Sequence, residues 1–158
     1  GWKMKLNLQD SESVAEHSYM MSVMAMVMAD LKNLNTEKIL KMTILHDWAE
    51  SKIGDFMPDE ITIEKKTELE EYAMTEILDE LPPTIKDNYF DIWNDYKENL
   101  SNEARFVHEL DKLEMALQGK IYEKETDPEK IKPFLISAVE KIADDELKKI
   151  LIGILEKK

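Results

Sequence analysis

The sequence contains no cysteine, no apolar run long enough to span a membrane, and few positive charges. Without cysteine the chain forms no disulfides and offers no thiolate to a metal. The lack of a long apolar run or a signal-peptide pattern leads us to expect a cytoplasmic protein with no membrane partner. Lys and Arg total 21 against 34 Asp and Glu, and the net charge of −13 disfavours binding to a nucleic acid polymer.

Glycine and proline are also scarce, at four and five residues, and no strand-like alternation of apolar and polar residues occurs. The sequence therefore predicts an all-α fold, a compact helical bundle that forms a single domain over residues 1–158. A chain of this length can bury about 70% of its unfolded surface. The expected helices cover about 14–33, 36–54, 62–81, 83–97, 102–123, 133–143 and 145–157, with Asn35 or Thr36 and Ser101 or Asn102 as caps.

The helix expected at 14–33 is the most apolar stretch of the chain. Its methionines and valines between Met20 and Met28 point in nearly every direction around a helix, which predicts burial on most sides. Adaptable core packing or a contact between two copies of the chain explains such a stretch better than a cofactor pocket. We therefore expect a homodimer.

Four polar residues could close around one divalent metal ion: His17, His46, Asp47 and Asp111. Imidazole nitrogen together with carboxylate oxygen suits Zn²⁺, Mn²⁺ or Co²⁺, and Mg²⁺ is a further candidate. Two neutral and two anionic ligands would leave the bound ion formally uncharged. It could then still accept water and substrate oxygens.

The His46-Asp47 dipeptide is too short to be specific by itself, and His46 could instead be a hydrogen-bonded core histidine. Its surroundings favour the metal site. The run from Lys41 to Glu50 is helical in pattern, which would place His46 and Asp47 about 100° apart around one helix. Glu50 would lie on the same face.

Three segments of the chain together resemble a known family. Residues 12–19, 46–55 and 106–115 are similar to the signature segments of HD-domain phosphohydrolases, and within them to the 5′-deoxynucleotidase branch. The match runs in consistent order from Trp2 to about Gln118. The resemblance implies an HD-type helical fold and the four metal ligands named above. With three histidines in the chain, we expect one metal ion.

The resemblance also implies catalytic roles for Glu50 and Asp55, which match positions assigned to catalysis in the family. On their own, Glu50 would read as a solvated helix residue and Asp55 as a turn residue after Gly54. One would handle the attacking water and the other the leaving oxygen, with the choice left open. Trp2 matches a tryptophan near the substrate. Because the family carries an arginine before this position, we expect a segment to precede Gly1.

His108 is the remaining histidine and the obvious competitor for the metal, since it lies three residues before Asp111. Related sequences generally carry a lysine there. We therefore expect His108 to lie behind the ligands or at the surface rather than on the ion.

Three functions are compatible with these residues. The first is a metal-dependent 5′-nucleotidase acting on deoxyribonucleoside monophosphates. The second is an HD phosphohydrolase acting on a cyclic nucleotide, a triphosphate or an alarmone, and the third is a non-catalytic, metal-stabilised regulatory module. Glu50 and Asp55 disfavour the third, because a structural metal site needs no spare carboxylates. The order of the segments favours the first, with a small nucleotide as substrate.

Overall fold

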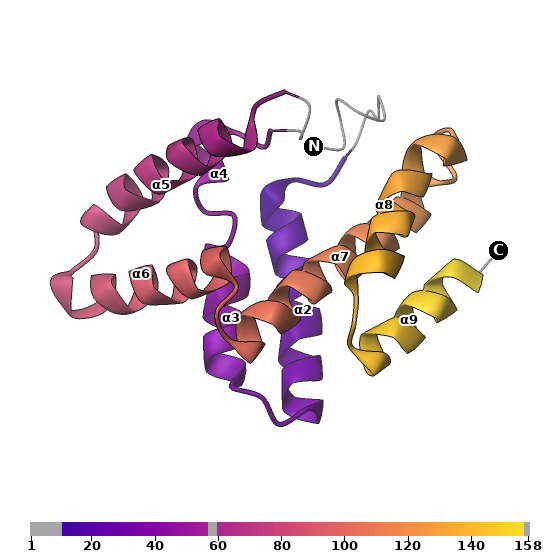
Figure 1. Ribbon diagram of the computed structural model, residues 1–158, viewed down its shortest axis with the longest axis horizontal. Coiled ribbons are helices and arrows are strands. Elements are labelled where there is room, and N and C mark those ends of the chain that lie inside the picture. Colours follow the sequence, from indigo (N-terminus) through magenta and orange to yellow (C-terminus); the bar gives the residue numbers. More distant parts are fainter. Residues whose placement is uncertain (1–10, 57–59, 157–158) are drawn as a thin grey trace.

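The computed structural model describes residues 11–56 and 60–156, and this part of the chain is helical with no strand (Figure 1). The predicted all-α fold is therefore confirmed. The helices are α2 (Val14–Leu31), α3 (Thr36–Leu45), α4 (Glu50–Ile53), α5 (Ile63–Asp79), α6 (Pro83–Glu98), α7 (Asn102–Tyr122), α8 (Pro128–Lys141) and α9 (Asp145–Glu156).

Side-chain caps set where most of these helices begin. Ser13 and Glu16 form a reciprocal capping box at the start of α2. Asn35 caps α3 and Ser101 caps α7, as the sequence predicts, because each side chain accepts a hydrogen bond from a backbone N–H of the first turn. Pro83 occupies the first position of α6, where its missing N–H costs nothing.

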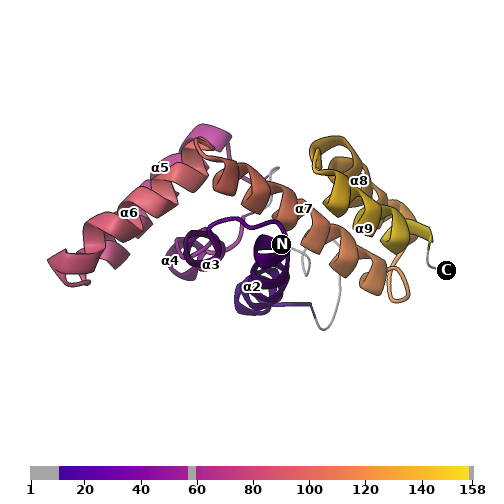
Figure 2. The ribbon, with the colours of Figure 1, turned by 90° about the horizontal axis from the view of Figure 1, so that it is seen from below.

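Helix α7 runs through the middle of the molecule and contacts most of the other helices (Figure 2). Helices α8 and α9 pack on one side of it and α2 and α3 on another, while α5 and α6 form an arm beyond α3. The main core lies where α2, α3 and α7 meet. Its fully buried side chains include Met21, Met42, Leu110 and Leu113.

The helix predicted to run from 36 to 54 is broken in the structure, and this part of the prediction is wrong. Helix α3 ends at Leu45, and backbone bonds from Trp48 N to Leu45 O (3.2 Å) and from Glu50 N to Asp47 O (3.0 Å) turn the chain before the short α4. Leu45 packs into the main core, whereas Ala49 packs into a second apolar cluster against α5. The chain must turn to reach both. Gly54, with φ of 84°, ends α4 as expected.

Helix α8 begins five residues earlier than predicted. Asp127 caps it and Pro128 takes the first position, so that Pro133 lies inside the helix. Ile131, fully buried beside Tyr122, anchors this first turn to the end of α7. Packing against α7 thus outweighs the lost backbone donor at Pro133.

Helix α2 is less buried than the sequence predicts. Met21, Ala25 and Ala29 face the core, but the opposite side of the helix is exposed and apolar. The exposed side chains are Tyr19, Met20, Val23, Met26, Val27 and Leu31. The expectation of burial on most sides is therefore wrong.

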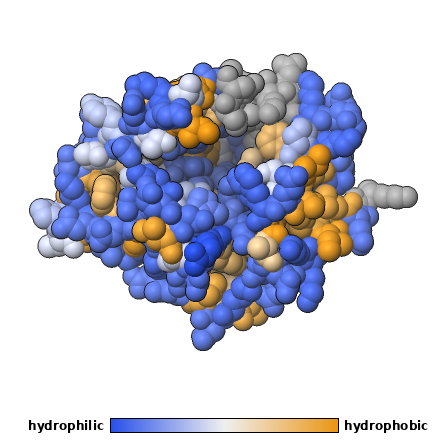
Figure 3. All heavy atoms as spheres, in the orientation of Figure 1, coloured by the Kyte–Doolittle hydropathy of each residue, from blue (hydrophilic) through white to orange (hydrophobic). Residues whose placement is uncertain are grey.

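On the face shown in Figure 3 the surface is mostly hydrophilic, with apolar side chains gathered mainly over α8 and α9. None of the helices in residues 11–56 and 60–156 is apolar over enough of its length to cross a bilayer.

Candidate metal centre and active site

Three helices bring His17, His46 and Asp111 together. His17 lies on α2, His46 caps the end of α3 and Asp111 lies on α7. One donor atom from each lies within 4.8 Å of the others, and His17 Nε2 is 3.4 Å from Asp111 Oδ1. Donor atoms this close together could hold a metal ion.

Asp47 lies at the edge of this cluster. Its Oδ2 is 3.1 Å from His46 Nε2 and 3.9 Å from His17 Nε2. Its side chain is 25% exposed, against 12% for His17 and 14% for Asp111. Because the chain turns after Leu45, Asp47 reaches the site from a turn rather than from the helix predicted for it.

The orientation of His46 suits a metal ligand. Its Nδ1 is 2.8 Å from the carbonyl oxygen of Thr43, which can only accept, so Nδ1 carries the proton of the neutral ring. Its buried Nε2 makes no hydrogen bond within the described part of the chain, although Asp47 Oδ2 is near. An unpaired buried nitrogen is costly unless a ligand completes it. A divalent cation fits this donor set.

Glu114 also belongs to the site, although it was not among the residues predicted from the sequence. It lies one turn after Asp111 on α7, its side chain is 1% exposed, and its Oε2 is 2.6 Å from His17 Nδ1. By accepting the Nδ1 proton it leaves His17 Nε2 free to face Asp111 and Asp47. Its position three residues after Asp111, on the same face of a helix, could have indicated from the sequence that it belongs to the site. Glu12 also lies close to His17 and Glu114.

Metal binding is expected to raise the melting temperature more at pH 8 than at pH 6. In the metal-free protein burial disfavours the charge on His17, but hydrogen bonds to Asp111 and Glu114 outweigh it and raise the pKa to about 11. The stability gained from this proton is full below the unfolded pKa of about 6.5 and is lost gradually as pH rises towards 11. A metal replacing the proton therefore meets less competition at pH 8.

Calorimetry with Mn²⁺ and with a chelator at both pH values would measure this difference. An equal metal-induced rise of the melting temperature at pH 6 and pH 8 would contradict this prediction.

Glu50 lies beside the cluster without belonging to it. Its side chain is 8% exposed and 3.4 Å from Lys66 Nζ on α5. Burial is the main cause that raises the pKa of Glu50 to about 7, followed by the nearby Asp47 and Asp55 carboxylates. Asp55 is exposed, directly after Gly54. The structure thus places Glu50 near both Asp47 and Asp55.

A cavity of about 210 Å³ opens next to these donors. His46, Asp47 and Asp111 line it together with side chains of α5 and α6. The side chains from α5 and α6 are Lys66, Glu70, Trp93, Tyr96 and Lys97. A small anionic molecule in this cavity would lie against the metal donors and near a lysine.

His108 is not among the candidate metal donors. It donates from Nε2 to the carbonyl oxygen of Tyr96 at 2.9 Å. Trp2 lies outside the described residues, so its predicted contact with the substrate stays a prediction.

Comparison with known sequences identifies relatives over nearly the whole chain. A family model described as HD domain matches residues 1–151. The mouse protein named 5′-deoxynucleotidase HDDC2 is 38% identical over 149 residues, which cover 93% of this chain and 74% of the relative. The yeast (Saccharomyces cerevisiae) protein named 5′-deoxynucleotidase YGK1 is 30% identical over 161 residues, covering 99% of this chain and 74% of the relative.

Solved structures share the fold. The PH0347 protein of Pyrococcus horikoshii superposes with a TM-score of 0.79 at 27% identity, covering 98% of this chain and 88% of its own. A Magnetospirillum magnetotacticum protein described as a predicted metal-dependent phosphohydrolase gives a TM-score of 0.73 at 25% identity. The match covers 94% of this chain and 78% of the Magnetospirillum chain.

Proposed function

This chain belongs to the HD domain family, and from that premise we propose that it is a metal-dependent 5′-deoxynucleotidase. It would release phosphate from deoxyribonucleoside 5′-monophosphates. The observation that carries the proposal is the convergence of His17, His46 and Asp111, with His46 Nε2 buried and without a hydrogen bond in the described part of the chain. The names of its relatives in mouse and yeast support the same activity.

The proposed ligands of one divalent ion are His17, His46, Asp47 and Asp111. When bound, Mn²⁺, Co²⁺, Zn²⁺ or Mg²⁺ would supply Lewis acidity to a phosphoryl oxygen and lower the pKa of water. Glu114 would hold the ring of His17 in the required tautomer through the contact at its Nδ1.

Glu50 is the group that we assign to the attacking water. A carboxylate with a pKa of about 7 can take up a proton near neutral pH and release it again, which suits a general base. Lys66, 3.4 Å away, keeps this carboxylate in place. Asp55 is assigned to the leaving 5′-oxygen, because it is exposed and lies near Glu50. As the bond from water to phosphorus forms, Glu50 takes up a proton from the water; as the P–O5′ bond breaks, the 5′-oxygen receives a proton through Asp55.

A phosphate-release screen tests this function directly. Metal-stripped full-length protein would be supplied with Mn²⁺, Co²⁺, Mg²⁺ or Zn²⁺ and with mono-, tri- and cyclic nucleotides. Release from deoxyribonucleoside monophosphates is the expected result. Release from cyclic nucleotides or triphosphates alone would overturn the substrate assignment, and no metal-dependent release from any of them would overturn the enzyme assignment.

The expected partner is a small nucleotide rather than a polymer, supported by the net charge of −13. A cytoplasmic location is proposed from the lack of cysteine in the sequence.

Self-association as a dimer is expected through the exposed face of α2. That face carries no charge from Tyr19 to Ala29, in a chain that is otherwise strongly charged, and a second copy of it would cover its apolar surface. Val27, 50% exposed, lies within it, so Val27→Glu should yield monomers by placing like charges opposite each other.

Sedimentation at micromolar concentration would measure the change. Ile63→Glu, at an 82% exposed position on α5, is the matched control and should leave the dimer intact. An unmodified protein that sediments only as an 18.5 kDa species would contradict the dimer.

A further inference from the structure

Tyr96 lines the cavity beside the metal donors but has no part in the functions assigned so far. It lies on α6 and lines this cavity together with His46, Asp47 and Asp111. Its hydroxyl makes no hydrogen bond to any side chain or backbone group that the structure describes. A phenol is protonated at neutral pH, so this hydroxyl can donate a hydrogen bond. It is a free donor in a site dominated by carboxylates.

Two aromatic contacts hold the ring of Tyr96. The His108 ring stacks on it at 4.1 Å with an interplanar angle of 18°, and His46 meets it edge-on at 5.5 Å. His108 also donates from Nε2 to the carbonyl oxygen of Tyr96 itself, at 2.9 Å. Both the ring and the backbone of Tyr96 are therefore restrained by one histidine.

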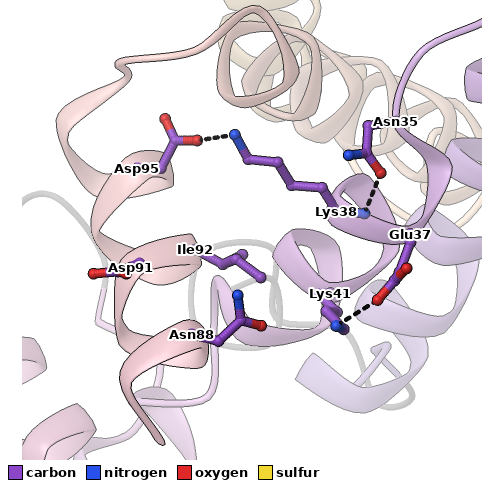
Figure 4. Close-up of a pocket in the computed structure, with 8 residues that line it drawn as sticks. All are labelled: Asn35, Glu37, Lys38, Lys41, Asn88, Asp91, Ile92 and Asp95. Carbon is purple, nitrogen blue, oxygen red and sulfur yellow. Dashed lines mark hydrogen bonds and ion pairs between the residues drawn. The ribbon is translucent and has the colours of Figure 1, made fainter. Parts of the chain in front are cut away.

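The neighbouring residue fixes this turn of α6 to two other helices. Asp95 forms an ion pair with Lys38 of α3 at 2.6 Å, visible in Figure 4, and accepts a hydrogen bond from Ser101 Oγ at 2.7 Å. Figure 4 shows a hollow of about 450 Å³ between α3 and α6. Both lysines that line it form ion pairs, Lys38 with Asp95 of α6 and Lys41 with Glu37 of its own helix. It anchors α6, whereas the cavity at Tyr96 retains an unpaired donor.

A phosphate group within reach of His46, Asp47 and Asp111 would occupy the same small cavity as Tyr96. It arrives as a dianion beside Asp47, Glu50 and Glu70, and therefore needs donors. Lys66 is shared between Glu50 at 3.4 Å and Glu70 at 3.3 Å. A phenol supplies a further hydrogen bond.

We propose that the Tyr96 hydroxyl donates a hydrogen bond to a phosphate oxygen of the substrate, and that His108 is the positioning residue that holds Tyr96 for this contact. The proposal rests on the proposed phosphohydrolase function. It also gives His108, which is not among the candidate metal donors, a defined task.

Tyr96→Phe removes the donor and keeps the ring. Calorimetric titration of the metal-loaded protein with inorganic phosphate should show affinity about 10- to 100-fold weaker, the range for a hydrogen bond to a charged group, and KM for deoxyribonucleoside monophosphates should rise. Tyr89→Phe, on the same helix but outside the cavity, is the matched control and should bind phosphate like the unmodified protein. Unchanged phosphate affinity and KM in Tyr96→Phe would overturn the proposal.

A double-mutant cycle isolates the role of His108. His108→Ala should weaken phosphate binding when Tyr96 is present and have no further effect in the Tyr96→Phe background. Equal losses in both backgrounds would show that His108 acts on the site in some other way, and would overturn its assignment. The phosphate titration decides these points separately from the hydrolysis screen, so a failure of the proposed activity is distinguishable from a failure of the Tyr96 contact.

Discussion

Replacing His17 or Asp111 with alanine is expected to abolish metal binding and to lower the melting temperature. Each residue is one of the three whose donors lie within 4.8 Å of one another, so the remaining ligands would no longer surround an ion. A metal at 100 times its dissociation constant stabilises the folded protein by about 2.7 kcal/mol, and this contribution would disappear. His17→Ala would also leave the buried Glu114 carboxylate unpaired, which costs roughly 3–5 kcal/mol.

Elemental analysis of the purified proteins and calorimetry would measure both effects. Asp111→Asn keeps the shape of the side chain and serves as a second test if the alanine variants fold poorly. Asp91→Ala, which removes an exposed carboxylate of α6, is the control and should retain its metal. Full metal content in both His17→Ala and Asp111→Ala would exclude these residues as ligands.

Glu50→Gln and Asp55→Asn are expected to lose turnover without losing metal. Neither residue belongs to the group of closely spaced donors, whereas general acid–base assistance contributes about 10²- to 10⁴-fold. Each variant should lose about that factor in kcat on deoxyribonucleoside monophosphates, with a smaller change in KM.

The pH dependence identifies the base. A base must be deprotonated to act, so the kcat of the unmodified protein should fall as pH drops through about 7, the pKa of Glu50. In Glu50→Gln this fall in kcat should be absent. Glu64→Gln, an exposed change in the first turn of α5, is the control. Wild-type turnover in both Glu50→Gln and Asp55→Asn, at equal metal content, would favour a non-catalytic, metal-stabilised module.

The helical class and most helix boundaries could be predicted from the order of residues, because they depend on interactions within a few residues along the chain. Asn35 and Ser101 cap their helices through bonds to backbone groups three residues away. Gly54 ends α4 because glycine adopts a positive φ easily. The identities of the candidate donors were also available, because imidazole and carboxylate chemistry belongs to the residue itself.

Features that depend on distant packing were missed. The break after Leu45 arises because Leu45 and Ala49 enter different apolar clusters, and nothing between them in the sequence marks it. Glu114 meets His17 across 97 residues of sequence. Tyr96 reaches the metal donors only because α6 packs against α3 and α7. Burial and cross-helix contacts give these ordinary side chains their places in the site, and such contacts exist only once the helices have packed together.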